Sequence, residues 1–97
     1  MIREEIILTL RNSREELTNR FGVKSLALFG SVARDEVTPV SDVDLLVEFD
    51  RPVGLFGLFA LQDYLENVLG CSVDVNTPDS LKPRLRSAIL AECIRVD

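Results

Sequence analysis

Residues 28–49 read LFGSVARDEVTPVSDVDLLVEF, and this stretch decides how the rest of the chain is interpreted. Its first residues complete a short apolar run, 25–29, that ends at Gly30, which is typical of a strand followed by a turn. Its last residues, 42–49, alternate between apolar side chains and mostly polar ones, which is the pattern of a strand with one buried face. The buried face would comprise Val43, Leu45, Val47 and Phe49. The stretch therefore predicts two strands, the first of which ends in a glycine turn.

Outside this stretch, apolar spacing predicts further helices and one more strand. Gly22 and Gly70 follow two of the helical patterns and predict where those helices end, and Thr38–Pro39 should break a short helix after the glycine turn. The predicted helices cover 2–20, 31–35, 55–69 and a last segment from Pro83, and the strands cover 25–29, 42–49 and 72–76. The order α-β-α-β-α-β-α predicts a small α/β layer fold. Phe56, Phe59 and Tyr64, at helical spacing, are expected in the core or an interface rather than in a base-stacking platform.

Composition limits the class of protein. The 97 residues suffice for one domain, 1–97, and 46% apolar with 28% charged residues is typical of a folded globular chain rather than a disordered one. The longest apolar stretches are far shorter than the ~20 residues that span a bilayer. The charged N-terminus, MIREEIILTL, lacks the features of a signal peptide. We therefore expect a cytoplasmic domain without membrane contact.

Charge and residue usage narrow the chemistry further. The net charge of −5 argues against a general nucleic-acid binder, although it leaves room for local use of Lys82, Arg84 and Arg86. The chain has no histidine, so catalysis would depend on carboxylates, hydroxyls or thiols. Cys71 and Cys93 lack metal-site spacing, and we expect both to be reduced, structural thiols.

Three acidic residues stand on the polar side of the predicted strands. If Val73 and Val75 face the helices, then Asp74 points to the same side as Asp42 and Asp44. Three neighbouring carboxylates repel one another unless a cation lies between them, and a set of oxygen ligands alone suggests Mg²⁺ or Mn²⁺. The alternative is ordinary solvated surface, which is the more frequent origin of an isolated D-x-D pair. The third acid, on a separate strand, favours the metal interpretation.

The glycine turn is the second candidate feature. Gly30 would let the backbone approach a phosphate closely, and Ser31 adds a hydroxyl donor at the start of the following helix. Taken alone, Gly-Ser is a common turn and cap pair, and the lysine spacing of a P-loop is missing. Combined with a carboxylate cluster for a divalent metal, however, it indicates phosphoryl or nucleotidyl transfer.

The same residues match a known family pattern. Gly30-Ser31, ten further residues and then Asp42-Val43-Asp44 resemble the GS-x10-DxD signature of the DNA polymerase β-like nucleotidyltransferase superfamily. Within it, the chain resembles the minimal nucleotidyltransferase (MNT) group. The similarity extends to SVDV, residues 72–75, and to the closing LKPRLRSAILAECIRV, residues 81–96.

This resemblance implies a mixed three-stranded sheet flanked by four helices. It implies that Asp42 and Asp44 bind two Mg²⁺ ions, and that Asp74 is the third carboxylate, acting as ligand and as base for the attacking hydroxyl. Gly30 and Ser31 would hold the nucleotide triphosphate.

Two residues that follow the glycine turn could affect phosphate binding. Arg34 lies one turn beyond the glycine and is expected either to contact a phosphate or to remain solvated or paired with Glu36. Asp35 stands where relatives often carry glycine, and it adds negative charge near the phosphate approach.

Two functions from different classes follow. The first is an enzyme that moves AMP from ATP to an acceptor hydroxyl in a Mg²⁺-dependent reaction. MNT proteins are similar to antitoxins encoded beside HEPN-domain toxins, so the resemblance implies a HEPN-domain partner and a tyrosine acceptor. The second is a catalytically weak subunit that neutralises its partner by binding alone. The clustered acids favour the enzyme, and the sequence leaves open whether the chain also forms a homodimer.

Overall fold

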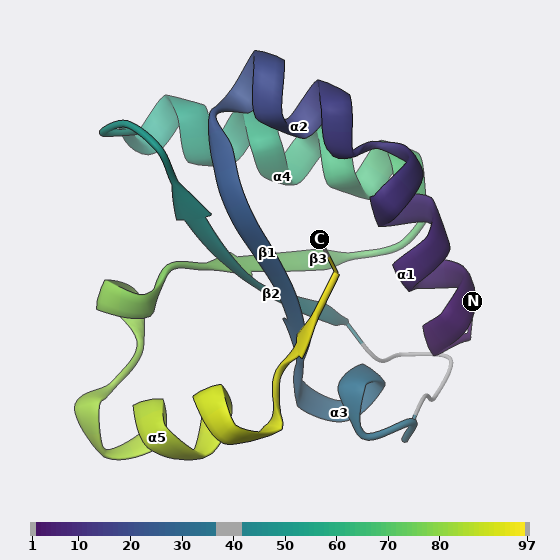
Figure 1. Ribbon diagram of the computed structural model, residues 1–97, viewed down its shortest axis with the longest axis vertical. Helices are drawn as coiled ribbons and strands as arrows, with labels where there is room; N and C mark the ends of the chain where they lie inside the picture. Colours follow the sequence, from purple (N-terminus) through teal and green to yellow (C-terminus); the bar gives the residue numbers. More distant parts are fainter. Residues whose placement is uncertain (1, 37–41, 97) are drawn as a thin grey trace.

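A mixed β-sheet with helices on both faces forms the centre of the molecule (Figure 1). The computed structural model describes residues 2–36 and 42–96, and within them four strands lie in the order β3-β2-β1-β4. The strands are β1 (Val23–Phe29), β2 (Val43–Phe49), β3 (Val73–Asn76) and β4 (Ile94–Arg95). β1 pairs antiparallel with both β2 and β4, whereas β2 and β3 are parallel.

The helices connect these strands in a way that the pairing requires. Parallel strands need a long crossover, and α4 (Leu55–Leu69) supplies it between β2 and β3. A single short turn of helix, α3 (Gly30–Ala33), follows β1 directly. The remaining helical elements are α1 (Arg3–Asn12), α2 (Arg14–Phe21), the 3-10 turn η1 (Pro78–Ser80) and α5 (Pro83–Glu92).

The alternation of side chains along the strands divides the core in two. The larger cluster lies between the sheet and α1, α2 and α4, and it contains Ile6, Leu17, Leu28, Leu45 and Leu65 among others. The smaller cluster lies on the opposite face, where α5 and Leu81, in the link between η1 and α5, cover the sheet. It contains Ala27, Phe29, Leu46 and Leu81, with Ile89 and Cys93 packed against it. The predicted α/β fold is thus confirmed. Side chains from both faces of β2 are buried, one face in each cluster.

Some details of the prediction are wrong. Residues 2–20 do not form one helix, because the chain turns at Ser13, whose hydroxyl donates to the carbonyl of Thr9. The described part of the chain has five α-helices and four strands instead of four and three. The extra strand, β4, is too short to leave a pattern in the sequence. The predicted helix ends before Gly22 and Gly70 are confirmed.

Two of the three aromatic residues expected in the core or an interface, Phe56 and Phe59, lie outside the core. Phe56 is 90% exposed and Phe59 is 57% exposed, because α4 turns Leu61, Leu65 and Leu69 toward the sheet instead. Tyr64 is half-buried and stacks at a tilt on Phe21. The contribution of α4 to the core therefore comes mainly from its leucines.

Two further findings complete the fold. The predicted break at Thr38–Pro39 lies outside the described residues. Within the part that is described, no helix has both the length and the apolar character needed to cross a membrane.

Candidate active site

The glycine turn lies directly against the first strand aspartate. Gly30 follows β1 with a φ of +77°, a left-handed backbone conformation that residues with a side chain rarely adopt. A Cβ placed on it would collide with Oδ2 of Asp44. Glycine is therefore the residue that fits this position with least strain, and the backbone of the motif lies against a candidate metal ligand.

The two strand aspartates lie side by side. In the register of the sheet Asp44 is opposite Phe29 on one side and opposite Asp74 on the other. Neighbouring strands are ~4.8 Å apart, so the two carboxylates are close neighbours on one face. That face also carries Leu46 of the smaller core cluster, as the alternation in the sequence predicted. Asp42 lies exposed just before β2.

The electrostatics of Asp44 reflect this crowding. Burial raises the pKa of the half-buried Asp44 carboxyl above its ordinary value, and the charges of Asp74 and then Asp42 raise it further. The positive charge of Arg34 opposes the rise. The three predicted carboxylates therefore interact, and their mutual repulsion is only partly offset by the protein's own cation.

The donor set fits a hard divalent cation by its chemistry. All three side chains offer carboxylate oxygen, which Mg²⁺ prefers, and a cation would relieve the repulsion felt at Asp44. In residues 2–36 and 42–96, no three acidic, histidine or cysteine side chains converge closely enough to hold a metal ion. The assignment of Asp42 and Asp74 to a metal thus stays a prediction.

Arg34 is engaged by two carboxylates. It lies at the end of α3 with its side chain 47% exposed, and its Nε donates to Oε2 of Glu36 at 3.3 Å. Its Nη1 donates to both oxygens of Glu92 at 3.2 and 3.3 Å. These hydrogen bonds, first to Glu36 and then to Glu92, raise the pKa of Arg34. The predicted pairing with Glu36 is confirmed, and a phosphate would have to compete with it.

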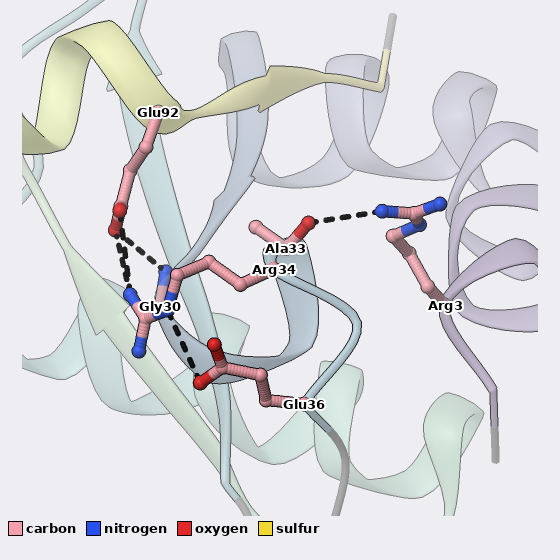
Figure 2. Close-up of polar contacts among 6 residues, drawn as sticks. All are labelled: Arg3, Gly30, Ala33, Arg34, Glu36 and Glu92. Carbon is pink, nitrogen blue, oxygen red and sulfur yellow. Dashed lines mark hydrogen bonds and ion pairs between the residues drawn. The ribbon is translucent and has the colours of Figure 1, made fainter.

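Sequence reasoning missed two residues that hold α3 in place (Figure 2). Glu92, at the end of α5, accepts a hydrogen bond from the backbone N–H of Gly30 at 3.3 Å. On the other side, Arg3 of α1 donates to the carbonyl of Ala33 at 3.1 Å. Both contacts join segments far apart in the sequence, so no local pattern indicated them.

The other predicted residues lie in or just after α3 and at the start of α5. Ser31 is half-buried in α3, and its carbonyl accepts from the N–H of Glu36 at 2.8 Å. Asp35 has a φ of +61°, a left-handed conformation that glycine adopts with less strain than a residue with a side chain. Lys82 and Arg84 are exposed on α5, whereas Arg86 is half-buried. Gly30, Arg34, Asp44 and Asp74 are thus brought to one end of the sheet.

Comparison with known proteins agrees with this arrangement. The profile of the nucleotidyltransferase domain family matches residues 10–96. Protein adenylyltransferase MntA of Thermococcus cleftensis is 40% identical over 93 residues, which cover 96% of this chain and 94% of the relative. The family match spans the glycine turn and the positions of the three aspartates.

Solved structures share the fold. One described as a "putative minimal nucleotidyltransferase" superposes with a TM-score of 0.81 at 38% identity, covering 97% of this chain and 95% of the other. A complex described as a tri-AMPylated Shewanella oneidensis HEPN toxin with MNT antitoxin contains a chain that superposes with a TM-score of 0.67. At 16% identity, covering 99% of this chain and 72% of that one, this second likeness concerns the fold alone. The chain therefore belongs to the nucleotidyltransferase domain family, within its minimal nucleotidyltransferase group, and is a nucleotidyltransferase.

Proposed function

We propose that this enzyme transfers AMP from ATP to a tyrosine hydroxyl of a HEPN-domain partner protein. The observation that carries the proposal is the contact between the Gly30 turn and Asp44, with Asp74 opposite in the sheet. This places candidate phosphate-binding backbone beside carboxylates, which is the arrangement that nucleotidyl transfer needs. The name of the Thermococcus relative, protein adenylyltransferase, supports AMP as the transferred group.

Different residues would bind the triphosphate and the metal ion. Gly30 and Ser31 would bind the triphosphate, and Arg34 would add its positive charge. Asp42, Asp44 and Asp74 would hold Mg²⁺, which when bound supplies neutralisation of phosphate charge.

Asp74 is the candidate base. In the reaction the acceptor oxygen bonds to the α-phosphorus, the bond from that phosphorus to the pyrophosphate oxygen breaks, and pyrophosphate leaves. The hydroxyl proton must go to a nearby base, and in a chain without histidine the exposed carboxylate of Asp74 is well placed to accept it.

The partner assignment has separate support. The Shewanella complex with the same fold joins an MNT antitoxin to an AMPylated HEPN toxin. We therefore infer that a HEPN-domain protein is both partner and substrate.

Intact-mass analysis tests the proposal. The protein is incubated with its co-purified partner, ATP and Mg²⁺, and the partner should gain the mass of AMP while pyrophosphate appears. Asp44→Asn should abolish transfer, whereas Asp74→Asn should lower the rate by orders of magnitude and leave ATP affinity largely intact. An unmodified partner in a tight, inactive complex would overturn the proposal in favour of neutralisation by binding alone.

A further inference from the structure

Glu92, the acidic residue that ends α5, contacts the glycine turn across the fold. One of its carboxylate oxygens accepts from the N–H of Gly30 at 3.3 Å, and both accept from Nη1 of Arg34 at 3.2 and 3.3 Å (Figure 2). A single carboxylate thus binds the backbone donor and the cation of the same turn. Those are two of the donors that the proposed function assigns to the triphosphate.

Helix formation does not account for an acid at this position. Glu92 is the last residue of α5, where the carbonyl end of the helix dipole disfavours negative charge. Its charge is therefore balanced by contacts across the fold rather than within its own helix. The side chain is 33% exposed, so it can turn into solvent without passing through the core.

The contacts are also of a kind that another anion can replace. Charge-assisted N–H···O bonds are strongest at ~2.7–2.9 Å, and each of these is longer. Glu36 also binds Arg34, so the guanidinium already faces two negative charges. A phosphate approaching this turn meets occupied donors and a repulsive carboxylate.

We infer that Glu92 is an internal competitor of the nucleotide: it occupies the Gly30 N–H and Arg34, and triphosphate binding displaces it. The inference rests on the proposed function, because it assigns both donors to the triphosphate. Its consequence is that Glu92 lowers nucleotide affinity while fastening the end of α5 to α3. Movement of α5 and filling of the site are then linked.

Calorimetric titration of the full chain with Mg²⁺-tripolyphosphate and Mg²⁺-ATP, at fixed ionic strength, tests this linkage. Glu92→Gln should bind both ligands about threefold to tenfold more tightly, the size expected when a partly exposed ion pair no longer competes. The matched control is Glu36→Gln, which removes the same charge from Arg34 but leaves the Gly30 N–H occupied. Its gain should be clearly smaller, and adenosine, which lacks phosphate, should show no gain with either variant.

A second readout separates competition from a purely structural role. Without ligand, Glu92→Gln should melt below the parent, because a contact between α5 and α3 is lost, yet tripolyphosphate should raise its melting temperature by more than it raises the parent's. If Glu92→Gln does not fold, Glu92→Asp, with a carboxylate one methylene further from both donors, serves the same test.

The outcomes are distinguishable. If the parent binds nucleotide and Glu92→Gln binds it equally or less tightly, the inference is wrong and the proposed function stands. If neither the parent nor any variant binds ATP or tripolyphosphate, the proposed nucleotide site is wrong and the inference falls with it.

Discussion

Gly30 has a left-handed backbone, and the space beside it is filled by the carboxylate of Asp44. The second obstacle can relax, because a carboxylate can rotate away, whereas the backbone conformation stays costly for any residue with a Cβ. A change at this position therefore affects the fold as well as any ligand. The sequence motif alone did not separate the two effects.

Gly30→Ala should lower stability even without nucleotide. The left-handed conformation costs ~1–2 kcal/mol for a residue with a Cβ. For a domain of this size, 1 kcal/mol corresponds to a shift of about 4–8 °C in the melting temperature. Thermal unfolding followed by circular dichroism measures it. The control is Gly54→Ala, where an added Cβ meets nothing within 4 Å and φ is −78°, so the midpoint should move much less. Equal midpoints for the two variants would contradict the strain at Gly30.

Asp44→Asn should melt at a higher temperature than the parent at neutral pH in the presence of a chelator. The folded-state pKa of Asp44 is raised, so its contribution to stability is full below the ordinary carboxyl pKa and is lost as pH rises through the raised value. The advantage of the variant should therefore disappear below about pH 4, where the parent carboxyl is protonated too.

Mg²⁺ should reduce this difference in melting temperature. Millimolar Mg²⁺ should raise the melting temperature of the parent by mass action and affect Asp44→Asn less, because one metal ligand is missing. Differential scanning fluorimetry with and without EDTA measures both effects. Identical responses to Mg²⁺ would exclude Asp44 as a ligand.

Among the elements, α4 has a second task besides covering the sheet. Glu66 near its end accepts a hydrogen bond from the N–H of Val73 at 3.0 Å, at the start of β3. β3 carries Asp74 and is joined to β2 at its first residues, where the N–H of Val43 donates to Ser72. The crossover helix thus fixes the position of the third carboxylate as well as the direction of its strand.

Glu66→Ala should lower the free energy of unfolding by about 1–2 kcal/mol, because the half-buried N–H of Val73 loses its acceptor. Glu66→Gln keeps a side-chain oxygen in reach and should lose less. Urea unfolding of the two variants measures the difference. If Glu66→Gln and Glu66→Ala lower the free energy of unfolding equally, the hydrogen bond from Val73 does not stabilise β3.

At the scale of the whole molecule, substitutions in the larger core cluster should destabilise the protein far more than substitutions of the exposed aromatic residues of α4. Leu65 is fully buried in the larger cluster, and Leu65→Ala should cost ~2–5 kcal/mol. Phe56 lies on the same helix but is 90% exposed, so Phe56→Ser should change the free energy of unfolding by about 0.5 kcal/mol or less. Chemical denaturation of both variants provides the comparison. A large loss in Phe56→Ser would mean that the exposed face of α4 contributes to the fold.

Much of the architecture follows from local patterns. The alternation in 42–49 placed one face of β2 in the core, and the glycines after two helices marked their ends. The turn at Ser13 and the short β4 were missed, because the backbone conformation of a single residue interrupts the helix and pairing with β1 defines the strand. The exposure of Phe56 was missed because α4 is apolar on more than one side, so periodicity could not choose the buried face.

The sequence by itself determined the α/β class, the candidate residues Gly30, Asp42, Asp44 and Asp74, and the common face of Asp44 and Asp74, because side-chain direction in a strand depends only on parity. Tertiary structure alone decided that Gly30 touches Asp44, and that Asp44 lies opposite Asp74, because these relations depend on strand register. It alone also brought Glu92 to the glycine turn, across 62 residues of chain, through the packing of α5 on the sheet. Local patterns specify which groups are present and which way they point, whereas pairing and packing specify which of them meet.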